Sequence, residues 1–490
     1  MDDKSNNNVV SNLPDRRHPG FKLKKSERGN YYLYFFGQNI FYWLVTSFLA
    51  TYMTLMGVNP LYSAGIILAV KVWDAVDDVL FGFLFDKIHF KRLKGKFMPW
   101  LKISVGLIPI ATILLFADQS NFSETMKLIW MAVFYICWDT AYTLCDTPIF
   151  AMVNTLTDNF DERTTLVSYS RIASSIGGFI PGSIGAFLIS QKVGLSFFNM
   201  ALILSIVGFL CLIPMSFRGK EHNLTSTDKE ENYSLKSMFK YLTQNKYLFI
   251  FFMFALIHGA LQTSGALGML VSFYLFNDEL FTVIVGLITG IPAIILNFFM
   301  PKIIKKVDKV KLLWISQIIF VVLGFVTYFV GYNNQLLFLI FTGIKTIPGS
   351  FVGVLLFMLL PDCAEYGKFK SGIDAKGITF SIQTFNSKLT AAISSWLALL
   401  IVGLFGFVAY QASDFGQLKE LFEAGIALQS PLALKGLWIT YALVPVIGDA
   451  LSLIPLFFYK MRDRDVKIMM LANEDKITHE EALKEIGHKL

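Results

Sequence analysis

The sequence predicts an all-α polytopic membrane protein with about twelve transmembrane helices in two six-helix halves. Three observations support this fold class. The chain of 490 residues is 54% hydrophobic and only 16% charged, whereas soluble domains carry about 25% charged residues. Its apolar residues form runs of about 20, the length that crosses a hydrocarbon core of about 30 Å. A polar segment, 218–245, separates these runs into two groups of about six.

The apolar runs define the expected spans, whereas the first 29 residues lack the apolar core of a cleaved signal peptide. The spans are 31–56, 60–86, 99–117, 127–156, 165–189, 195–217, 246–276, 280–300, 311–331, 335–361, 377–408 and 434–459. We expect an N-terminal tail (1–29), an N-terminal bundle (30–217), a middle loop (218–245), a C-terminal bundle (246–460) and a C-terminal tail (461–490). In that last tail, Thr478-His479-Glu480-Glu481 fits a capping box and predicts a short helix over 479–487.

Basic residues are concentrated in the short loops that follow the second and eighth spans. Short basic loops face the cytoplasm, so both termini are expected to be cytoplasmic in a multi-pass protein of the cell inner (plasma) membrane. The net charge of +7 therefore reflects these loops and not a nucleic-acid-binding surface. The four cysteines show no paired spacing, so we expect neither a disulfide framework nor a metal site.

Four charged residues lie inside the second span: Lys71, Asp74, Asp77 and Asp78. A charge at the centre of a membrane helix costs about 2.5–3.5 kcal/mol on insertion scales, and such groups usually mark an ion or substrate path. Helical periodicity places all four on one face. Three carboxylates so close require a bound cation or at least one bound proton, which predicts a cation-coupling site. The alternative is a Lys71–Asp74 pair that only joins helices, but it leaves two acids unexplained.

The fourth span carries a second polar face, formed by Asp139, Thr143 and Asp146 at i, i+4 and i+7, with Tyr142 beside it. An oxygen-rich face of this kind suits sodium, a proton relay or sugar hydroxyls. Thr143 could instead bond back to its own helix, as membrane threonines often do.

Two isolated cations, Arg171 in the fifth span and Lys388 in the eleventh, require anionic partners, which the five intramembrane aspartates can supply. Lys388 follows an unusually polar run that begins at Gln383. For Arg171, snorkelling to the membrane interface is the alternative. Three further residues are read as packing groups or have no evident partner: His258, Lys345 and Asp449.

Three motifs resemble those of the glycoside–pentoside–hexuronide:cation symporter family of the major facilitator superfamily, whose best-known member is melibiose permease. Val72–Asp78 resembles the family's W-D-A-x-x-D, Gly95–Trp100 resembles G-K-F-x-P-W, and Tyr142–Pro148 resembles Y-T-x-x-D-x-P. Glu365–Phe369 and Gln383–Lys388 also fit, and the match runs from about residue 30 to 460. Several motifs in the right order make the resemblance specific.

The resemblance implies the major facilitator fold and sugar import coupled to a cation. By motif position, Asp74, Asp78 and Thr143 match the family's cation site, and Asp77 stands where melibiose permease has an asparagine. Phe150 stands where that protein has a tryptophan. The candidate substrate-binding residues are Asn39, Tyr142, Asp146, Phe150, Arg171, Gln383 and Lys388, and Asp77 and Asp139 join the candidate cation site.

Two departures from melibiose permease decide the expected ligands. Asn39 replaces a sugar-binding aspartate, which puts melibiose itself in doubt, and Asp139 adds an acid beside the cation site. The added negative charge favours a resident proton over sodium. We therefore expect H⁺-coupled import of a di- or oligosaccharide glycoside, with Na⁺ coupling or a non-transporting sugar sensor as alternatives.

The other expected partners follow from the same sequence features. The lipid bilayer surrounds the chain, no nucleic acid binds it, and a monomer is expected. The sequence contains no nucleotide-binding Gly-rich loop and no metal-ligand set. We accordingly expect neither an enzyme nor a bound cofactor.

Overall fold

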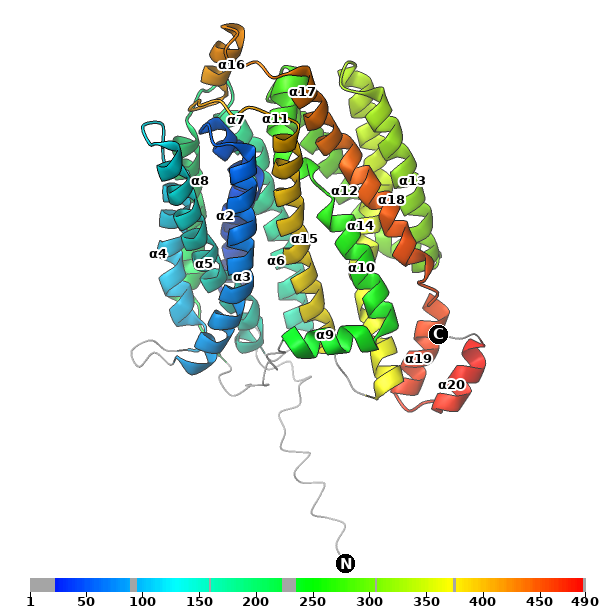
Figure 1. Ribbon diagram of the computed structural model, residues 1–490. Coiled ribbons are helices and arrows are strands. Elements are labelled where there is room, and N and C mark those ends of the chain that lie inside the picture. Colours follow the sequence, from blue (N-terminus) through cyan, green and yellow to red (C-terminus); the bar gives the residue numbers. More distant parts are fainter. Residues whose placement is uncertain are drawn as a thin grey trace, which may run out of the picture. The chain divides into compact units, whose positions relative to one another are not determined.

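The computed structural model describes residues 23–88, 95–157, 160–222, 235–304, 306–372 and 376–487, and their regular elements are helices (Figure 1). The chain forms two compact units: Met1–Leu49 with Val72–Glu230, and Ala50–Lys71 with Glu231–Leu490. The tip of the first helical hairpin therefore belongs to the second unit. An isolated bridge between Met56 and Gln411 and a hydrogen bond from Ala412 N to Leu55 O (2.7 Å) attach it there. The expected boundaries of the two bundles stay a prediction.

The first unit is built from long helices and two short segments that continue one of them, and together they match the first six expected spans. They are α2 (Lys25–Leu55) and α3 (Pro60–Lys87), whose adjoining ends lie in the second unit, then α4 (Met98–Leu115), α5 (Glu124–Leu156), α6 (Phe160–Ile180), the π-helical segment η1 (Pro181–Gly185), α7 (Ala186–Leu188) and α8 (Phe197–Arg218). Ser123 and Ser196 cap α5 and α8 by accepting hydrogen bonds from backbone N–H groups in the first turn.

The second unit contains the remaining helices. They are α9 (Leu235–Gln244), α10 (Lys246–Ala260), α11 (Ser264–Phe276), α12 (Phe281–Ile304), α13 (Lys309–Val330), α14 (Gln335–Ser371), α15 (Lys376–Leu404), α16 (Phe415–Glu423), α17 (Pro431–Trp438), the π-helical segment η2 (Ile439–Leu443), α18 (Val444–Phe457), α19 (Asp463–Asn473) and α20 (His479–Ile486). The capping box of α20 is confirmed, because Thr478 and Glu481 accept hydrogen bonds from each other's backbone N–H.

Three expectations about these elements are corrected. The span expected at 246–276 is two helices, interrupted between Ala260 and Ser264, and the Thr263 hydroxyl in the interruption donates to the Thr440 carbonyl of η2. Helix α14 continues beyond the expected end at 361, because its added turns are packed against the C-terminal tail. The middle loop and the loop after α15 also contain helices, α9 and α16, which were not predicted.

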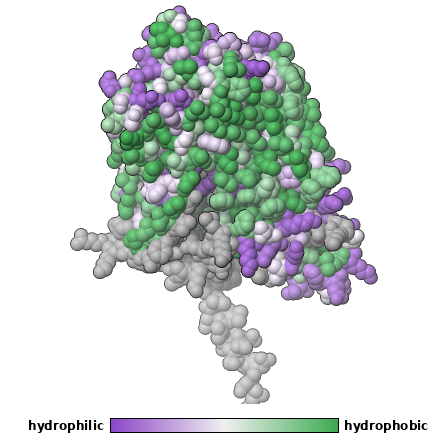
Figure 2. All heavy atoms as spheres, in the orientation of Figure 1, coloured by the Kyte–Doolittle hydropathy of each residue, from purple (hydrophilic) through white to green (hydrophobic). Residues whose placement is uncertain are grey.

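Among the described residues, eight helices are long and apolar enough to cross a membrane. The expected spans 31–56, 60–86, 165–189 and 280–300 also form helices, although they are not among those eight. In α3 the intramembrane charges lower the apolar content. Figure 2 shows hydrophobic residues along the lengths of the helices and hydrophilic residues gathered near their ends. This distribution is typical of a polytopic membrane protein.

The G-K-F-x-P-W motif forms the start of α4 and is held by an acid from beyond α8. The Glu221 carboxylate accepts hydrogen bonds from the backbone N–H groups of Lys96 (3.0 Å), Phe97 (2.8 Å) and Met98 (2.8 Å). These N–H groups have no partner inside the helix, so the carboxylate satisfies them. Gly95 precedes them at φ +100°, a conformation that favours glycine.

A similar contact occurs in the second unit, where Asp463 follows the last long helix. Its carboxylate accepts from Lys309 N (3.0 Å) at the start of α13, and Lys309 Nζ pairs with Asp463 and Asp362. In each half of the sequence, an acid that follows the sixth span thus binds the start of the third span. This correspondence supports the internal repeat that the sequence pattern indicated.

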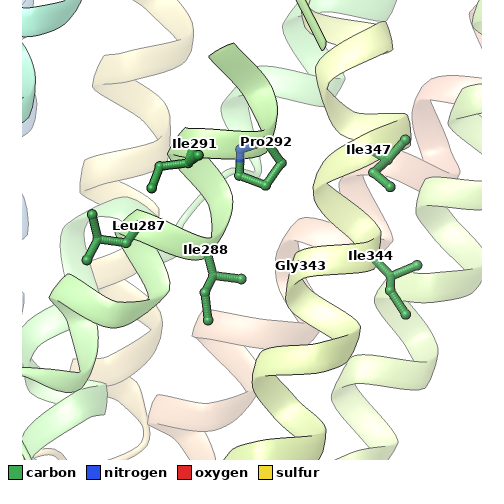
Figure 3. A pocket seen from close by; sticks show the side chains of 7 residues that line it. All are labelled: Leu287, Ile288, Ile291, Pro292, Gly343, Ile344 and Ile347. Carbon is green, nitrogen blue, oxygen red and sulfur yellow. The ribbon is translucent and has the colours of Figure 1, made fainter. Parts of the chain in front are cut away.

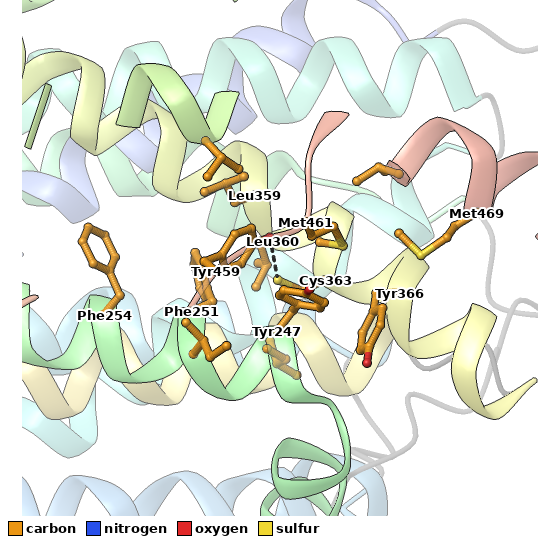
Figure 4. Close-up of a cluster of buried hydrophobic side chains, with 14 of the residues drawn as sticks. Tyr247, Phe251, Phe254, Leu359, Leu360, Cys363, Tyr366, Tyr459, Met461 and Met469 are labelled. Atoms are coloured by element: carbon orange, nitrogen blue, oxygen red, sulfur yellow. Dashed lines mark hydrogen bonds between the residues drawn. The ribbon is translucent and has the colours of Figure 1, made fainter. Parts of the chain in front are cut away.

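The C-terminal tail is part of the packed core of the second unit. Side chains of α10, α14 and α19 form one buried apolar cluster, in which Tyr459 OH lies 3.5 Å from Cys363 Sγ (Figure 4). The labelled members include Tyr247, Phe251, Leu359, Leu360, Tyr366, Met461 and Met469. Figure 1 shows α19 and α20 beside the end of α14.

We expect Met469→Ala to loosen this tail, because Met469 is fully buried (0% exposed) on α19. Removing a buried methionine side chain costs about 2–5 kcal/mol. Met470 is 41% exposed, so Met470→Ala is a matched control one residue away. Amide hydrogen exchange of α19 should accelerate in the first variant and not in the second. Equal protection in both variants would show that α19 is not held by this contact.

Candidate functional site

A polar contact joins α2 to α5 inside the first unit. The Gln38 amide nitrogen donates to Asp146 Oδ1, and Gln38 is itself almost fully buried. One position along α2, half-buried Asn39 donates from Nδ2 to the Phe35 carbonyl of its own helix (2.9 Å). Asp146 is half-buried, and its carboxylate, which can only accept when ionised, is oriented by the N–H of the Gln38 amide.

Aromatic rings flank this contact. The Phe150 ring lies 4.9 Å from the Phe35 ring, edge to face, and the Arg171 guanidinium of α6 lies 5.6 Å from the Phe150 centroid. Tyr142 is stacked on Trp138 at 5.2 Å and lies 5.5 Å from Tyr42. Two of the residues predicted to bind substrate, Phe150 of α5 and Arg171 of α6, are therefore brought together, whereas Asn39 of α2 bonds to its own helix. Aromatic surfaces with a few fixed polar groups are typical of small-molecule sites.

The candidate cation residues are buried on α3 and α5. Asp77 is 0% exposed, and Asp74, Asp139 and Thr143 are also buried. A hydrogen bond from Trp73 Nε1 to Thr140 Oγ1 (3.1 Å) joins the two helices at this level. Burying several carboxylates is costly unless cations, protons or hydrogen bonds compensate for their charges. The side chain of Asp78 lies outside the described residues.

Helix α5 carries residues of both groups. Asp139 and Thr143 belong to the buried acidic group, and Asp146 belongs to the polar contact with α2. Seven residues of α-helix span about 10 Å, so Asp139 and Asp146 are two turns apart on one rigid element. Any movement of α5 therefore acts on both groups together.

Gln383 and Lys388 lie on α15 in the second unit. Both are half-buried, and Gln383 Nε2 lies 3.4 Å from Ser387 Oγ in the same helix. Asn386 between them donates to the Phe252 carbonyl of α10 (3.3 Å), which fixes the rotation of this polar stretch. The pairing of Lys388 with an acid of α3 or α5 joins residues of different units and stays a prediction.

No group of three or more histidine, cysteine, aspartate or glutamate side chains is placed to hold a metal ion in the part of the chain that the structure describes. A cavity of about 440 Å³ opens between α12 and α14 (Figure 3). Its lining is Leu287, Ile288, Ile291, Pro292, Gly343, Ile344 and Ile347. None of these side chains can donate to or accept from a sugar hydroxyl, so this cavity is not the candidate substrate site.

Sequence reasoning missed the residues that position the predicted ones. Gln38, Trp73 and Thr140 make the contacts described above, yet none was singled out. Gln38 had a usable signal, because an amide inside an apolar span must find a partner. Trp73 lies within the W-D-A-x-x-D motif, but the sequence does not indicate that its indole N–H bonds to α5.

Comparison with known proteins identifies the family. Residues 31–463 match the family model described as MFS/sugar transport protein. The chain belongs to the glycoside–pentoside–hexuronide symporter family of the major facilitator superfamily. It is accordingly a multi-pass membrane protein of a sugar-transport family, as the resemblance implied.

Relatives match most of the length of this chain. The isoprimeverose transporter of Lactiplantibacillus pentosus is 27% identical over 474 residues, covering 94% of this chain and 93% of the relative. The uncharacterized symporter YnaJ of Bacillus subtilis is 26% identical over 467 residues, covering 93% and 96%. The lactose permease of Lactobacillus delbrueckii subsp. bulgaricus is 26% identical over 406 residues, covering 78% of this chain and 63% of the relative.

Solved structures confirm the fold of this chain. The crystal structure of the nucleoside transporter NupG superposes with a TM-score of 0.60 at 13% identity, covering 88% of this chain and 98% of that one. A bacterial homologue of the lysosomal transporter Spinster gives 0.59 at 10% identity, covering 89% and 97%. At such low identity the likeness concerns the fold alone.

Proposed function

We propose that this protein is a symporter that imports a glycoside, a di- or oligosaccharide, together with H⁺. We place it in the cell inner membrane with both termini in the cytoplasm. The alternatives are Na⁺ coupling and a sugar sensor that transports nothing. Sugar-transporting relatives, including an isoprimeverose transporter and a lactose permease, support a saccharide substrate.

One observation carries the proposal: α5 holds both a buried acidic group and a polar group flanked by aromatic rings. In the second group, Asp146 can accept sugar hydroxyls while Gln38 fixes its orientation, and Phe150 offers an apolar surface to a sugar ring. The Arg171 guanidinium beside Phe150 adds donors for hydroxyl oxygens. This combination suits an uncharged polyol ring better than a purely apolar ligand.

The buried acids support the proton. Asp74, Asp77 and Asp139 are buried on two adjoining helices, where three full negative charges would repel one another strongly. A proton bound to one carboxylate removes part of that repulsion without requiring a full coordination sphere. Because the acids and the sugar contacts share α5, occupancy of either group should change the affinity of the other, and such coupling is reciprocal. Transport then follows from rocking of the two halves.

The experiment that tests this function is a panel of glycosides screened in de-energised cells. Addition of the correct sugar should make the medium more alkaline, because protons enter with it, and sodium should have little effect. Uptake that rises severalfold with millimolar sodium at fixed pH, without proton movement, would refute the proton and leave the sugar symport intact. Absence of labelled-sugar counterflow in vesicles for every glycoside would favour the sensor.

A further inference from the structure

A second intramembrane polar cluster lies in the second unit and takes no part in the site described above. Asp449 of α18 is almost fully buried, and its Oδ1 accepts from His258 Nδ1 (2.7 Å) and from Gln262 Nε2 (3.0 Å). Its backbone carbonyl accepts from Gln317 Nε2 of α13 (3.0 Å). From the sequence, Asp449 had no evident partner and His258 was expected to be a packing group, and the structure corrects both expectations.

The cluster lies where two membrane helices depart from regular geometry. His258 is in the last turn of α10, and Gln262 lies in the interruption before α11. Across from it, Thr263 donates to the Thr440 carbonyl of η2, the π-helical segment that precedes α18. Interrupted membrane helices and π-helical segments occur frequently at functional sites.

The geometry assigns a tautomer to His258. An ionised carboxylate can only accept, so the proton of the neutral imidazole must lie on Nδ1. The lone pair is then on Nε2, and no group bonds to Nε2 among the residues that the structure describes. The His258 side chain is 18% exposed, whereas that of Asp449 is 3% exposed. The imidazole is thus oriented by the hydrogen bond of Nδ1 to Asp449, whereas its Nε2 lone pair can accept a proton.

The charges that surround His258 come from three helices. Asp449 is on α18, and Lys345 of α14 is near enough to Asp449 for their charges to attract. On α15, the Thr390 side chain packs against Gly259, the residue after His258. Lys388 is two residues from Thr390 and therefore lies within one helical turn of this contact. The charges of α9 lie beyond the opposite end of α10, about 18 Å away along its axis. The Phe254 ring, stacked at 6.0 Å, is the uncharged neighbour on α10.

We propose that His258 is a proton-binding site of the second unit, with Asp449 as its positioning partner. A proton from water binds to the Nε2 lone pair, and the neutral imidazole becomes an imidazolium that keeps its Nδ1–H bond to Asp449. No bond breaks in the protein. The imidazolium and Lys345 then share one carboxylate, so protonation weakens the attraction between α14 and α18 and strengthens that between α10 and α18. This site is separate from the carboxylates of α3 and α5.

Titration of the full-length protein in lipid nanodiscs tests the binding directly. The chain has 6 histidines, which can be labelled at Cε1 with ¹³C and followed between about pH 5 and 9, the range that brackets a histidine. One resonance, absent in His258→Gln, should titrate. In Asp449→Asn, neutral His258 should populate both tautomers, so its resonance should shift. This shift provides a second way to assign the resonance to His258. A His258 resonance that stays constant over this range while that of His222 changes would overturn the proposal.

A second measurement connects the proton to transport, and this part rests on the proposed function. In the wild type, the dissociation constant of the sugar should differ between a low and a high pH. In His258→Gln the ratio of these two constants should be smaller by about fivefold or more, a factor at the lower end of typical allosteric coupling. His222→Gln is the matched control, because His222 also pairs with an acid, Glu27 (2.9 Å), outside the expected spans. A wild-type ratio in His258→Gln would refute the connection to transport. Sodium-coupled uptake with an intact His258 titration would refute only the proposed coupling ion.

Discussion

Asp74→Asn should abolish uphill accumulation of sugar while leaving energy-independent exchange. Asp74 is buried on α3 in the group that includes Asp77 and Asp139. Coupling requires a carboxylate that can bind and release the cation, whereas exchange requires only the sugar contacts that we propose on α2, α5 and α6. The accumulation ratio in energised vesicles and the counterflow rate in de-energised ones measure the two properties separately.

The control for this variant is Asp118→Asn, which removes an exposed acid between α4 and α5. Accumulation should stay at the wild-type ratio in the control. A wild-type ratio in Asp74→Asn as well would show that this acid does not take part in coupling.

Asp146→Asn should weaken sugar binding by about 10- to 100-fold. A hydrogen bond to a charged group contributes about 1.5–3 kcal/mol, and each 1.4 kcal/mol corresponds to a factor of ten in the dissociation constant. The change keeps the size of the side chain, but the new amide replaces one acceptor oxygen that Gln38 or a sugar hydroxyl would use. Equilibrium binding of the sugar found in the glycoside screen measures the effect.

Glu124→Gln serves as the comparison, because Glu124 is an exposed acid in the first turn of the same helix. Its sugar affinity should equal that of the wild type. If Asp146→Asn also binds with wild-type affinity, the polar contact between α2 and α5 is structural and the sugar binds elsewhere.

The sequence alone predicted much of the helical framework, because each membrane-crossing helix needs about 20 consecutive apolar residues, and this pattern can be recognised from the local sequence. The first six expected spans correspond to helices or to helices joined through η1. The acids of the second and fourth spans were predicted to share polar faces by the periodicity of a single helix, and that stays a prediction. The structure adds that Asp74, Asp77 and Asp139 are buried.

The elements that the sequence did not predict have weak local signals. Helices α9 and α16 are short and lie between longer apolar runs. The interruption between α10 and α11 contains no proline, and the residues on both sides of it are apolar, so the sequence predicted one continuous span. Its position depends on the Thr263 contact with η2, which is far away in the sequence.

Only the tertiary structure decided which polar groups meet. Gln38 and Asp146 are separated by 108 residues, and His258 and Asp449 by 191. Hydropathy shows that a buried polar group needs a partner, but it carries no information about which helix will supply one. That choice depends on how the helices pack and on the rotation of each about its axis. The sequence therefore predicted most of the helical spans, whereas packing selected Gln38 as the partner of Asp146 and Asp449 as the partner of His258.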